Sequence, residues 1–446
     1  MAIAQRNVHF VSLGCPKNRV DAEHMLALLG VDGWRVVDEP LEAEAIVVNT
    51  CAFIGEAKEE SIDAILEMAE YKSEGRCKAL VVSGCLAQRY VSELSQEVPE
   101  VDVFLGTSEY DRIADILART ADMPRRVVSD PDFVATSTVP RVNSMPSHTA
   151  YLKIAEGCSN KCAFCIIPTL RGVQNSRQIP DLVVEAERLA ASGVKEIILV
   201  AQDLTAYGVD LPNRPQLHEL VAALADVTGI AWIRLMYAYP RNIREPLVEM
   251  LRDHDKVIPY LDMPIQHING AMLKRMKRGT SPDKIRRVLG RLRTEIPHLT
   301  MRSTLIAGFP GETDSEFREL CDFVQEFRFE RLGVFRYSNE EGTAAYDHDH
   351  QVDERIKFER QAELLRIQGA IHREHNDRLL GQKVQVLVDG PSEQTDLLLS
   401  GRTWGQAPEI DGTCYINDGW AEPGSLVTVK VEQVDDYDLV GGIVGA

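Results

Sequence analysis

Three cysteines within eight residues, Cys158, Cys162 and Cys165, constrain the fold of this chain more than any other feature. They follow a strand-like segment, 151–155, and Gly157 stands directly before the first of them. Soft metals and iron–sulfur clusters select thiolates, and a glycine lets a loop fold closely over a bulky group. Three ligands for a four-iron cluster predict one iron left open for chemistry. The alternative is a zinc knuckle or a chance clustering of cysteines, although no other Cys or His lies nearby in the sequence to complete a tetrahedral zinc site.

Three further cysteines, Cys15, Cys51 and Cys85, follow apolar runs typical of buried strands. The runs span 8–13, 45–50 and 79–84, with helix-like stretches at 20–29 and 61–69 and a fourth strand expected at 101–105. This alternation predicts a parallel α/β sheet, in which ligands bind outside the carboxyl ends of the strands. We therefore expect these thiols to converge and hold a second cluster. The alternative is that they are buried small hydrophobes, the role we expect for Cys77, Cys321 and Cys414.

The middle of the chain carries six strand-like runs separated by helix-sized intervals. They span 151–155, 196–201, 232–237, 259–264, 300–307 and 331–337. Alternating strands and helices at this spacing predict a partial (β/α)6 barrel of the TIM type, with its reactive groups at the carboxyl ends of the strands. A long helix is expected at 353–372.

Polar residues follow these runs and are expected at the mouth of the barrel. They include Gln202, Asp203, Arg241, Asn242, Gln266, His267, the loop 308–312 and the segment 338–340. We expect His267 to form hydrogen bonds there rather than to carry protons. The basic run at 274–278 is expected either to be a solvated helix face or to offset nearby carboxylates.

From residue 381 the pattern changes to the alternation of short strands, which predicts a small antiparallel β-barrel. The segment 378–446 holds four basic residues against eleven acidic ones. A nucleic-acid-binding surface gains affinity by neutralising phosphates, so this module is expected to prefer a basic protein, and tRNA binding is not expected.

The net charge of −19 over 446 residues supports the same choice of partner, because an acidic surface repels phosphate and attracts basic proteins. No apolar run reaches the roughly 18 residues of a membrane span. The first seven residues lack the layout of a secretion signal, and an odd number of cysteines fits a reducing compartment. We therefore expect a cytoplasmic protein with no membrane association.

Taken together, the segments resemble the radical S-adenosylmethionine methylthiotransferases. The run 12–18, Ser-Leu-Gly-Cys-Pro-Lys-Asn, is similar to the RimO branch, as are 165–168, 264–267 and 308–313. The resemblance implies a methylthiotransferase N-terminal domain at 6–123, a linker at 124–147, a radical core at 148–376 and a TRAM domain at 378–446.

The resemblance also implies the chemistry. Each cysteine trio would hold a 4Fe-4S cluster, and two S-adenosylmethionine molecules would serve as radical source and methyl donor, with no side chain acting as acid or base. The product would be a methylthiolated aspartate β-carbon in a basic small-subunit ribosomal protein, protein twelve, and an electron donor would be needed. Candidate contacts to S-adenosylmethionine are Phe164, Gln202, Arg302 and Gly308.

Two other functions remain open from the sequence. One is the tRNA adenosine methylthiotransferase of the MiaB branch, in which Gln-Met-Asn typically follows the first cysteine where this chain has Pro16-Lys17-Asn18. The other is a non-catalytic iron–sulfur protein that carries electrons or binds RNA, and it would not cleave S-adenosylmethionine.

Overall fold

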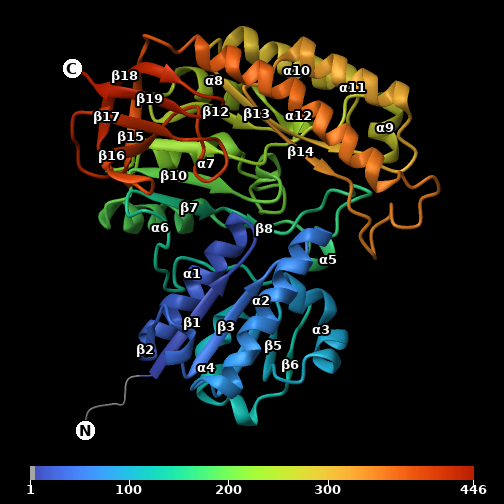
Figure 1. Ribbon diagram of the computed structural model, residues 1–446, viewed down its shortest axis with the longest axis vertical. Coiled ribbons are helices and arrows are strands. Elements are labelled where there is room, and N and C mark those ends of the chain that lie inside the picture. The colour runs from blue at the N-terminus through green and yellow to red at the C-terminus, as the bar shows by residue number, and fades with distance from the viewer. Residues whose placement is uncertain (1–5, 446) are drawn as a thin grey trace.

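The computed structural model describes residues 6–445 and builds them into three parts (Figure 1). Met1 to Gln5, where the absence of a secretion signal was inferred, and Ala446, the expected end of the last domain, lie outside the described residues. Among residues 6–445, no helix combines the length and apolar character needed to cross a membrane.

The N-terminal lobe, residues 6–127, is the predicted parallel α/β sheet, with strand order β2-β1-β3-β4-β5-β6. Its strands are β1 (Arg6–Ser12), β2 (Trp34–Val36), β3 (Ala45–Thr50), β4 (Ala79–Gly84), β5 (Val103–Leu105) and β6 (Arg126–Val127). Its helices are α1 (Pro16–Val31), α2 (Gly55–Glu74), α3 (Cys85–Glu97) and α4 (Ile113–Ala118). Every residue of β3 and β4 is buried, which explains why the sequence reveals these central strands clearly.

The core contains all six predicted strands in one parallel sheet, ordered β14-β13-β12-β11-β10-β7. They are β7 (Thr149–Lys153), β10 (Glu196–Val200), β11 (Trp232–Leu235), β12 (Val257–Asp262), β13 (Thr300–Ala307) and β14 (Arg331–Arg336). The helices are α5 (Ile167–Arg171), α6 (Ile179–Ala191), α7 (Leu217–Ala225), α8 (Glu245–Asp253), α9 (Gly270–Arg275), α10 (Pro282–Glu295), α11 (Asp314–Phe327) and α12 (Glu354–Asp377). A small ribbon of β8 (Ala155–Glu156) and β9 (Asn175–Ser176) stands beside the cysteine loop.

Local sequence fixes where several core helices begin. Thr313 and Glu316 form a capping box at the start of α11, and Ser281 caps α10 directly before Pro282. Because each cap stands a few residues from the mouth of the barrel, it also fixes the loops there.

The C-terminal part is a closed five-stranded barrel, as predicted. It consists of β15 (Lys383–Ser392), β16 (Thr395–Thr403), β17 (Cys414–Asp418), β18 (Leu426–Val434) and β19 (Leu439–Ile443). Most neighbouring strands are antiparallel, but β17 and β19 run parallel. The expectation of a purely antiparallel barrel is therefore wrong for this one pair.

This small barrel is packed into the core rather than tethered to it. Its Leu387 and Ala407 join a buried apolar cluster with Tyr151 of β7 and Tyr260 of β12. Arg234 of β11 donates to the Trp404 carbonyl at 2.8 Å, and residues 402–411 thereby close one side of the partial barrel.

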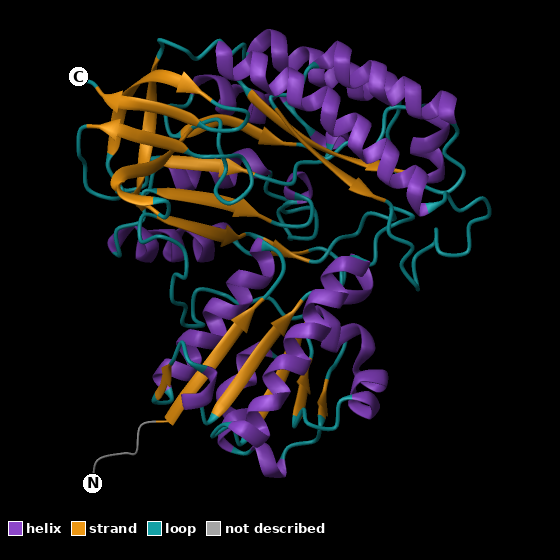
Figure 2. Cartoon of the chain, viewed as in Figure 1, coloured by secondary structure: helices purple, strands orange, loops and turns teal. Residues whose placement is uncertain are grey.

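The carboxyl ends of the N-terminal strands face the core. Figure 2 shows the arrowheads of that sheet directed toward the barrel, with α1 and α5 between the two parts. The cysteine-bearing edge of the lobe and the cysteine loop of the core therefore meet across one boundary.

Candidate functional site

The structure brings Cys15, Cys51 and Cys85 together at the edge of the N-terminal sheet. Thr50 and Gly84 are direct neighbours in the β3–β4 register, so Cys51 and Cys85, one residue later, leave adjacent strands that lie about 4.8 Å apart. Cys15 reaches them because Gly14, at φ +93°, passes close to Cys51, where an added Cβ would lie 3.2 Å from the Cys51 Sγ. The predicted convergence is therefore present.

Two helices begin at this trio. Cys15 is the N-cap of α1, and Cys85 is the first residue of α3. A helix N-terminus stabilises a nearby thiolate through its dipole. Burial acts in the opposite direction and raises the pKa of Cys51 to about 12, with the neighbouring thiols of Cys85 and Cys15 adding to the effect. The thiols therefore need a strongly bound cation to become thiolates.

Cys158, Cys162 and Cys165 form the second trio, in the loop between β8 and α5. Gly157 makes the loop possible, because its φ is +71° and an added Cβ would lie 2.2 Å from the Val173 carbonyl oxygen. Burial, with a smaller contribution from the Cys162 and Cys158 thiols, raises the pKa of Cys165 to about 12.

The donor set of each trio, three thiols, is of the type that iron–sulfur clusters take. Among residues 6–445, no group of three His, Cys, Asp or Glu side chains is close enough to hold one metal ion. A cube presents separate irons to separate thiolates, so its ligands do not converge on one point. The other three cysteines, Cys77, Cys321 and Cys414, are buried in apolar clusters, as expected, and the cluster of Cys77 also includes Cys85.

For Arg278, the expectation of a solvated helix face is wrong. Its side chain is buried and donates to the Cys162 Sγ at 3.2 Å and to the Pro264 carbonyl at 2.7 Å. The guanidinium also lies over the Tyr239 ring, 4.2 Å from its centroid. The chain turns after α9, and this turn directs the Arg278 side chain inward. The run of basic residues in the sequence did not reveal the turn.

A buried charge network joins the two lobes between the trios. Asp21 of α1 accepts from Lys153 of β7 and from Arg171 of α5, and Arg171 also donates to Asn18 at 2.8 Å. Sequence reasoning missed this network because its members lie up to about 150 residues apart and only folding brings them together.

Glu156 completes that network on the side of the cysteine loop. It accepts from Lys153 at 2.7 Å, from Arg171 at 3.3 Å and from Gln202 at 2.7 Å. Burial alone would raise the pKa of Glu156, but the charges of Lys153 and Arg171 hold it at about 2. Arg171 also acts on Cys85, whose pKa is raised by burial and lowered by this guanidinium.

The four candidate cofactor contacts lie in different settings. The Gln202 Oε1 is buried and has no hydrogen-bond partner within 6–445. Arg302 pairs with Asp262 at 3.2 Å and with Asp411 at 3.4 Å. Phe164 packs against an apolar cluster that includes Met272 and Phe309. Gly308 lies against the side chain of Lys357, because a Cβ added at Gly308 would come within 2.3 Å of the Lys357 Cγ.

His267 forms hydrogen bonds within the barrel mouth, as predicted. Its Nδ1 accepts from the backbone N–H groups of Ile268 and Asn269, both at 2.9 Å, which leaves the Nε2 to donate to Glu312 at 3.1 Å. Glu340, another residue of the expected mouth, instead accepts from Lys58 and Arg89 of the N-terminal lobe.

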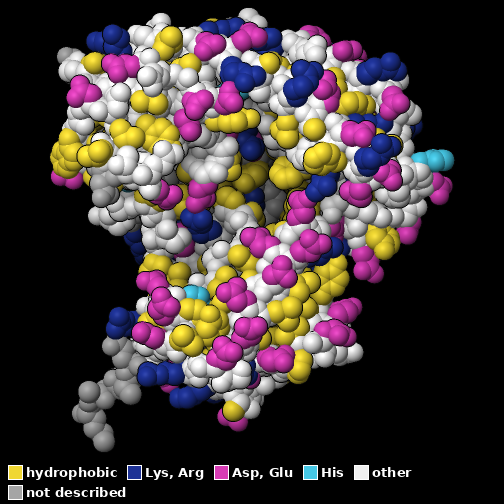
Figure 3. Space-filling view, viewed as in Figure 1, with side chains coloured by type: hydrophobic (Ala, Val, Ile, Leu, Met, Phe, Trp, Pro, Cys, Tyr) yellow, Lys and Arg dark blue, Asp and Glu magenta, His cyan; other side chains and the backbone are white. Residues whose placement is uncertain are grey.

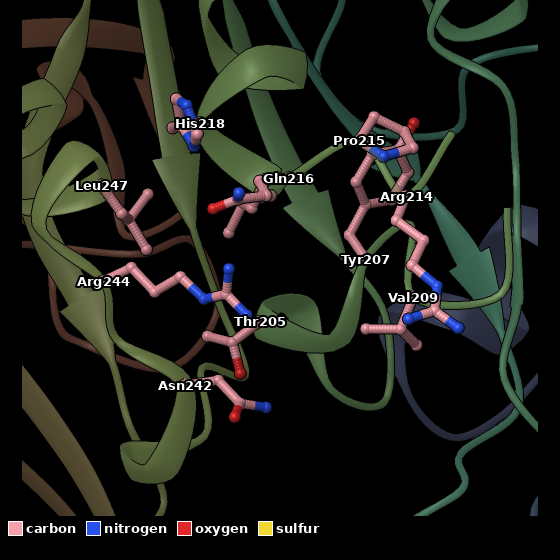
Figure 4. Close-up of a pocket in the computed structure, with 11 residues that line it drawn as sticks. Thr205, Tyr207, Val209, Arg214, Pro215, Gln216, His218, Asn242, Arg244 and Leu247 are labelled. Carbon is pink, nitrogen blue, oxygen red and sulfur yellow. The ribbon is translucent and has the colours of Figure 1, made fainter. Parts of the chain in front are cut away.

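A pocket lies outside the region of the trios, between the loops that follow β10 and β11 (Figure 4). Thr205, Gln216 and Arg244 stand around it, and none of the six cysteines lines it. Figure 3 shows a second hollow, in which hydrophobic side chains are visible, on the face of the core viewed there.

Comparison with known families matches each part of the chain. Residues 7–106 match the uncharacterized protein family UPF0004, residues 152–324 the Radical SAM superfamily, and residues 380–444 the TRAM domain.

Full-length relatives are similar throughout. The chain is 56% identical over 439 residues to the ribosomal protein uS12 methylthiotransferase RimO of Myxococcus xanthus, covering 98% of this chain and 92% of the relative. It is 50% identical over 446 residues to the protein of that name in Geobacter sulfurreducens, covering 100% of both. A solved structure of the radical S-adenosylmethionine methyltransferase TsrM from Kitasatospora setae shares the fold, with a TM-score of 0.57, 15% identity and 77% of each chain covered.

Proposed function

Because this chain belongs to the RimO family of radical S-adenosylmethionine methylthiotransferases, we propose that it methylthiolates the β-carbon of an aspartate in ribosomal protein uS12. The observation that supports the proposal is that each lobe gathers three cysteines, and that Cys85 of the N-terminal lobe shares a buried apolar cluster with Ile166, the residue directly after Cys165 of the core. An aspartate β-carbon has no proton that a side-chain base can remove, so the reaction needs cofactor chemistry.

Each trio is proposed to hold one 4Fe-4S cluster. Cys158, Cys162 and Cys165 would bind the cluster that works with S-adenosylmethionine, and the N-terminal trio would bind the second. When bound, these groups supply one-electron chemistry and a transferable methylthio sulfur, with an external protein as the electron donor. Arg278 and Arg171 offset the negative charge of the two sets of thiolates.

Gln202 is our candidate for orienting S-adenosylmethionine. Its amide nitrogen is fixed by Glu156, so its oxygen keeps one orientation, and that buried acceptor lacks a partner within the described chain. A buried acceptor without a donor costs stability, and a cofactor ammonium would satisfy it. Phe164, Arg302 and Gly308 remain predictions from the resemblance.

The substrate is proposed to be met as a basic protein in the cytoplasm. Of the four basic residues at 378–446, Arg402 is buried and paired with Glu196 and Asp389. The TRAM domain therefore presents an acidic exterior, which favours a basic ribosomal protein over tRNA.

The test uses the anaerobically reconstituted, reduced enzyme with labelled S-adenosylmethionine, supplied separately with uS12 and with tRNA. The expected result is incorporation of a methylthio group into uS12, loss of cofactor cleavage in Cys158→Ala, and cofactor cleavage without product in Cys51→Ala. Incorporation into tRNA alone would overturn the proposal.

A further inference from the structure

Lys17 is a buried cation without a partner. The residue is 8% exposed, and its Nζ lies 3.4 Å from the centroid of the Tyr237 ring. The other two buried lysines each bind a carboxylate: Lys153 pairs with Asp21 and Glu156, and Lys357 with Glu354. Within the described chain, no hydrogen-bond acceptor or carboxylate contacts the Lys17 ammonium directly.

This lysine connects the ligand-facing sides of the two lobes. It is the second residue of α1, two positions after Cys15, whereas Tyr237 follows β11 at the mouth of the core barrel. Tyr237 has a φ of 63°, a conformation that costs a bulky residue energy, and its N–H donates to the Asp262 Oδ2 at 3.2 Å. The aromatic face is thus held in place beneath the ammonium.

The nearby carboxylates are already engaged. Glu156 accepts from Lys153, Arg171 and Gln202, and Asp262 pairs with Arg302. A cation–π contact offsets only part of the cost of burying an ammonium, and the remaining demand is for an anion.

We propose that Lys17 binds the side-chain carboxylate of the substrate aspartate and so positions its β-carbon beside the N-terminal cysteine trio. The proposal rests on the function proposed above, since an aspartate is the residue to be modified. It makes Lys17 a residue that selects aspartate, because a neutral side chain would leave the ammonium unpaired.

A competing role is to offset the charge of the thiolates alone. Arg171 already acts on both Cys85 and Cys15, so the N-terminal trio has a cation without Lys17. The two roles differ in what they do to substrate binding, and this difference can be measured.

The experiment compares the holoenzyme with Lys17→Met, Lys17→Arg and the control Lys78→Met, at an exposed lysine of the same lobe. Each is titrated with a fluorescent uS12 peptide that carries either the target aspartate or asparagine, without S-adenosylmethionine, and is then assayed for KM and kcat. Iron content and peptide-free cofactor cleavage are measured in parallel.

The expected result is that wild type and Lys78→Met bind the aspartate peptide about tenfold to a hundredfold more tightly than the asparagine peptide. Lys17→Met should lose this preference through a higher KM, with unchanged iron content and peptide-free cleavage, and Lys17→Arg should retain part of it. If Lys17→Met keeps the preference, or changes only iron content or cleavage, the inference is overturned while the proposed function stands. If wild type modifies no peptide, the proposed function itself fails.

Discussion

Arg278, in the turn that follows α9, donates a hydrogen bond to the Sγ of Cys162 at 3.2 Å. A donor and a positive charge beside a cluster thiolate both favour the reduced, more negative state.

Replacing Arg278 by Met should therefore lower the reduction potential of the cluster on the core trio, by on the order of tens of millivolts. Redox titration followed by electron paramagnetic resonance measures the shift. Lys277→Met, which removes an exposed neighbouring charge, is the control and should leave the potential unchanged. Equal potentials in all three proteins would show that Arg278 does not tune the cluster.

Arg171→Met should destabilise the contact between the lobes. The substitution leaves the buried carboxylates of Asp21 and Glu156 with Lys153 as their shared cation, and breaking a buried ion network in this way costs about 3–5 kcal/mol. Denaturant unfolding of the metal-free protein measures the loss. Arg355→Met removes an exposed pair and should change the free energy of unfolding by less than about 1 kcal/mol.

Arg402→Met should show that the small barrel and the core unfold together. Arg402 binds the buried Glu196 at 2.5 Å and Asp389 at 2.9 Å, so its loss leaves Glu196 with Arg234 alone. We expect one cooperative thermal transition in both proteins, at a lower temperature in the variant. Two separate transitions in the wild type would contradict this account, and Lys430→Met, an exposed change in the same domain, should be neutral.

Acid should weaken the attachment of the segment between β6 and β7, which connects the lobes, because its Arg141 pairs at 2.6 Å with the buried Glu185 of α6. Burial alone would raise the pKa of Glu185, but Arg177 and Arg141 lower it to about 2 from 4.5. A depressed carboxylate pKa contributes stability that is present above pH 4.5 and is lost as the pH falls toward 2, worth about 3 kcal/mol.

Glu185→Gln should therefore reduce the slope of stability against pH in that window, as measured by denaturant unfolding at a series of pH values. Glu363→Gln, at an exposed pair with Arg366, is the matched control. A slope that Glu185→Gln leaves unchanged would rule out this carboxylate as the source of the acid sensitivity.

The sequence predicted the strands whose residues are all buried. The fully buried runs 45–50 and 79–84 appear as central strands, and the cysteines that follow them converge as expected. The edge strands β2 and β6 were not predicted because they are two or three residues long, and β6 lies in the interval expected to be a linker.

The polar contacts of the site were harder to predict, because they form between residues that are far apart in the sequence. Arg302 was selected for its place near a strand end, but its charge is taken up by Asp411 from the small barrel. Arg278 and Arg171 contact or face the thiols, yet they are separated from those cysteines by 86 to 156 residues along the chain and carry no local motif.

The central claim is that six cysteines form two separate cluster sites, and iron and sulfide content per chain tests it most directly. After anaerobic reconstitution we expect about eight irons in the wild type and in Cys77→Ala, and about four in each triple Cys→Ala variant of one trio. About four irons in the wild type, or a loss of all iron when either trio is removed, would contradict two independent sites.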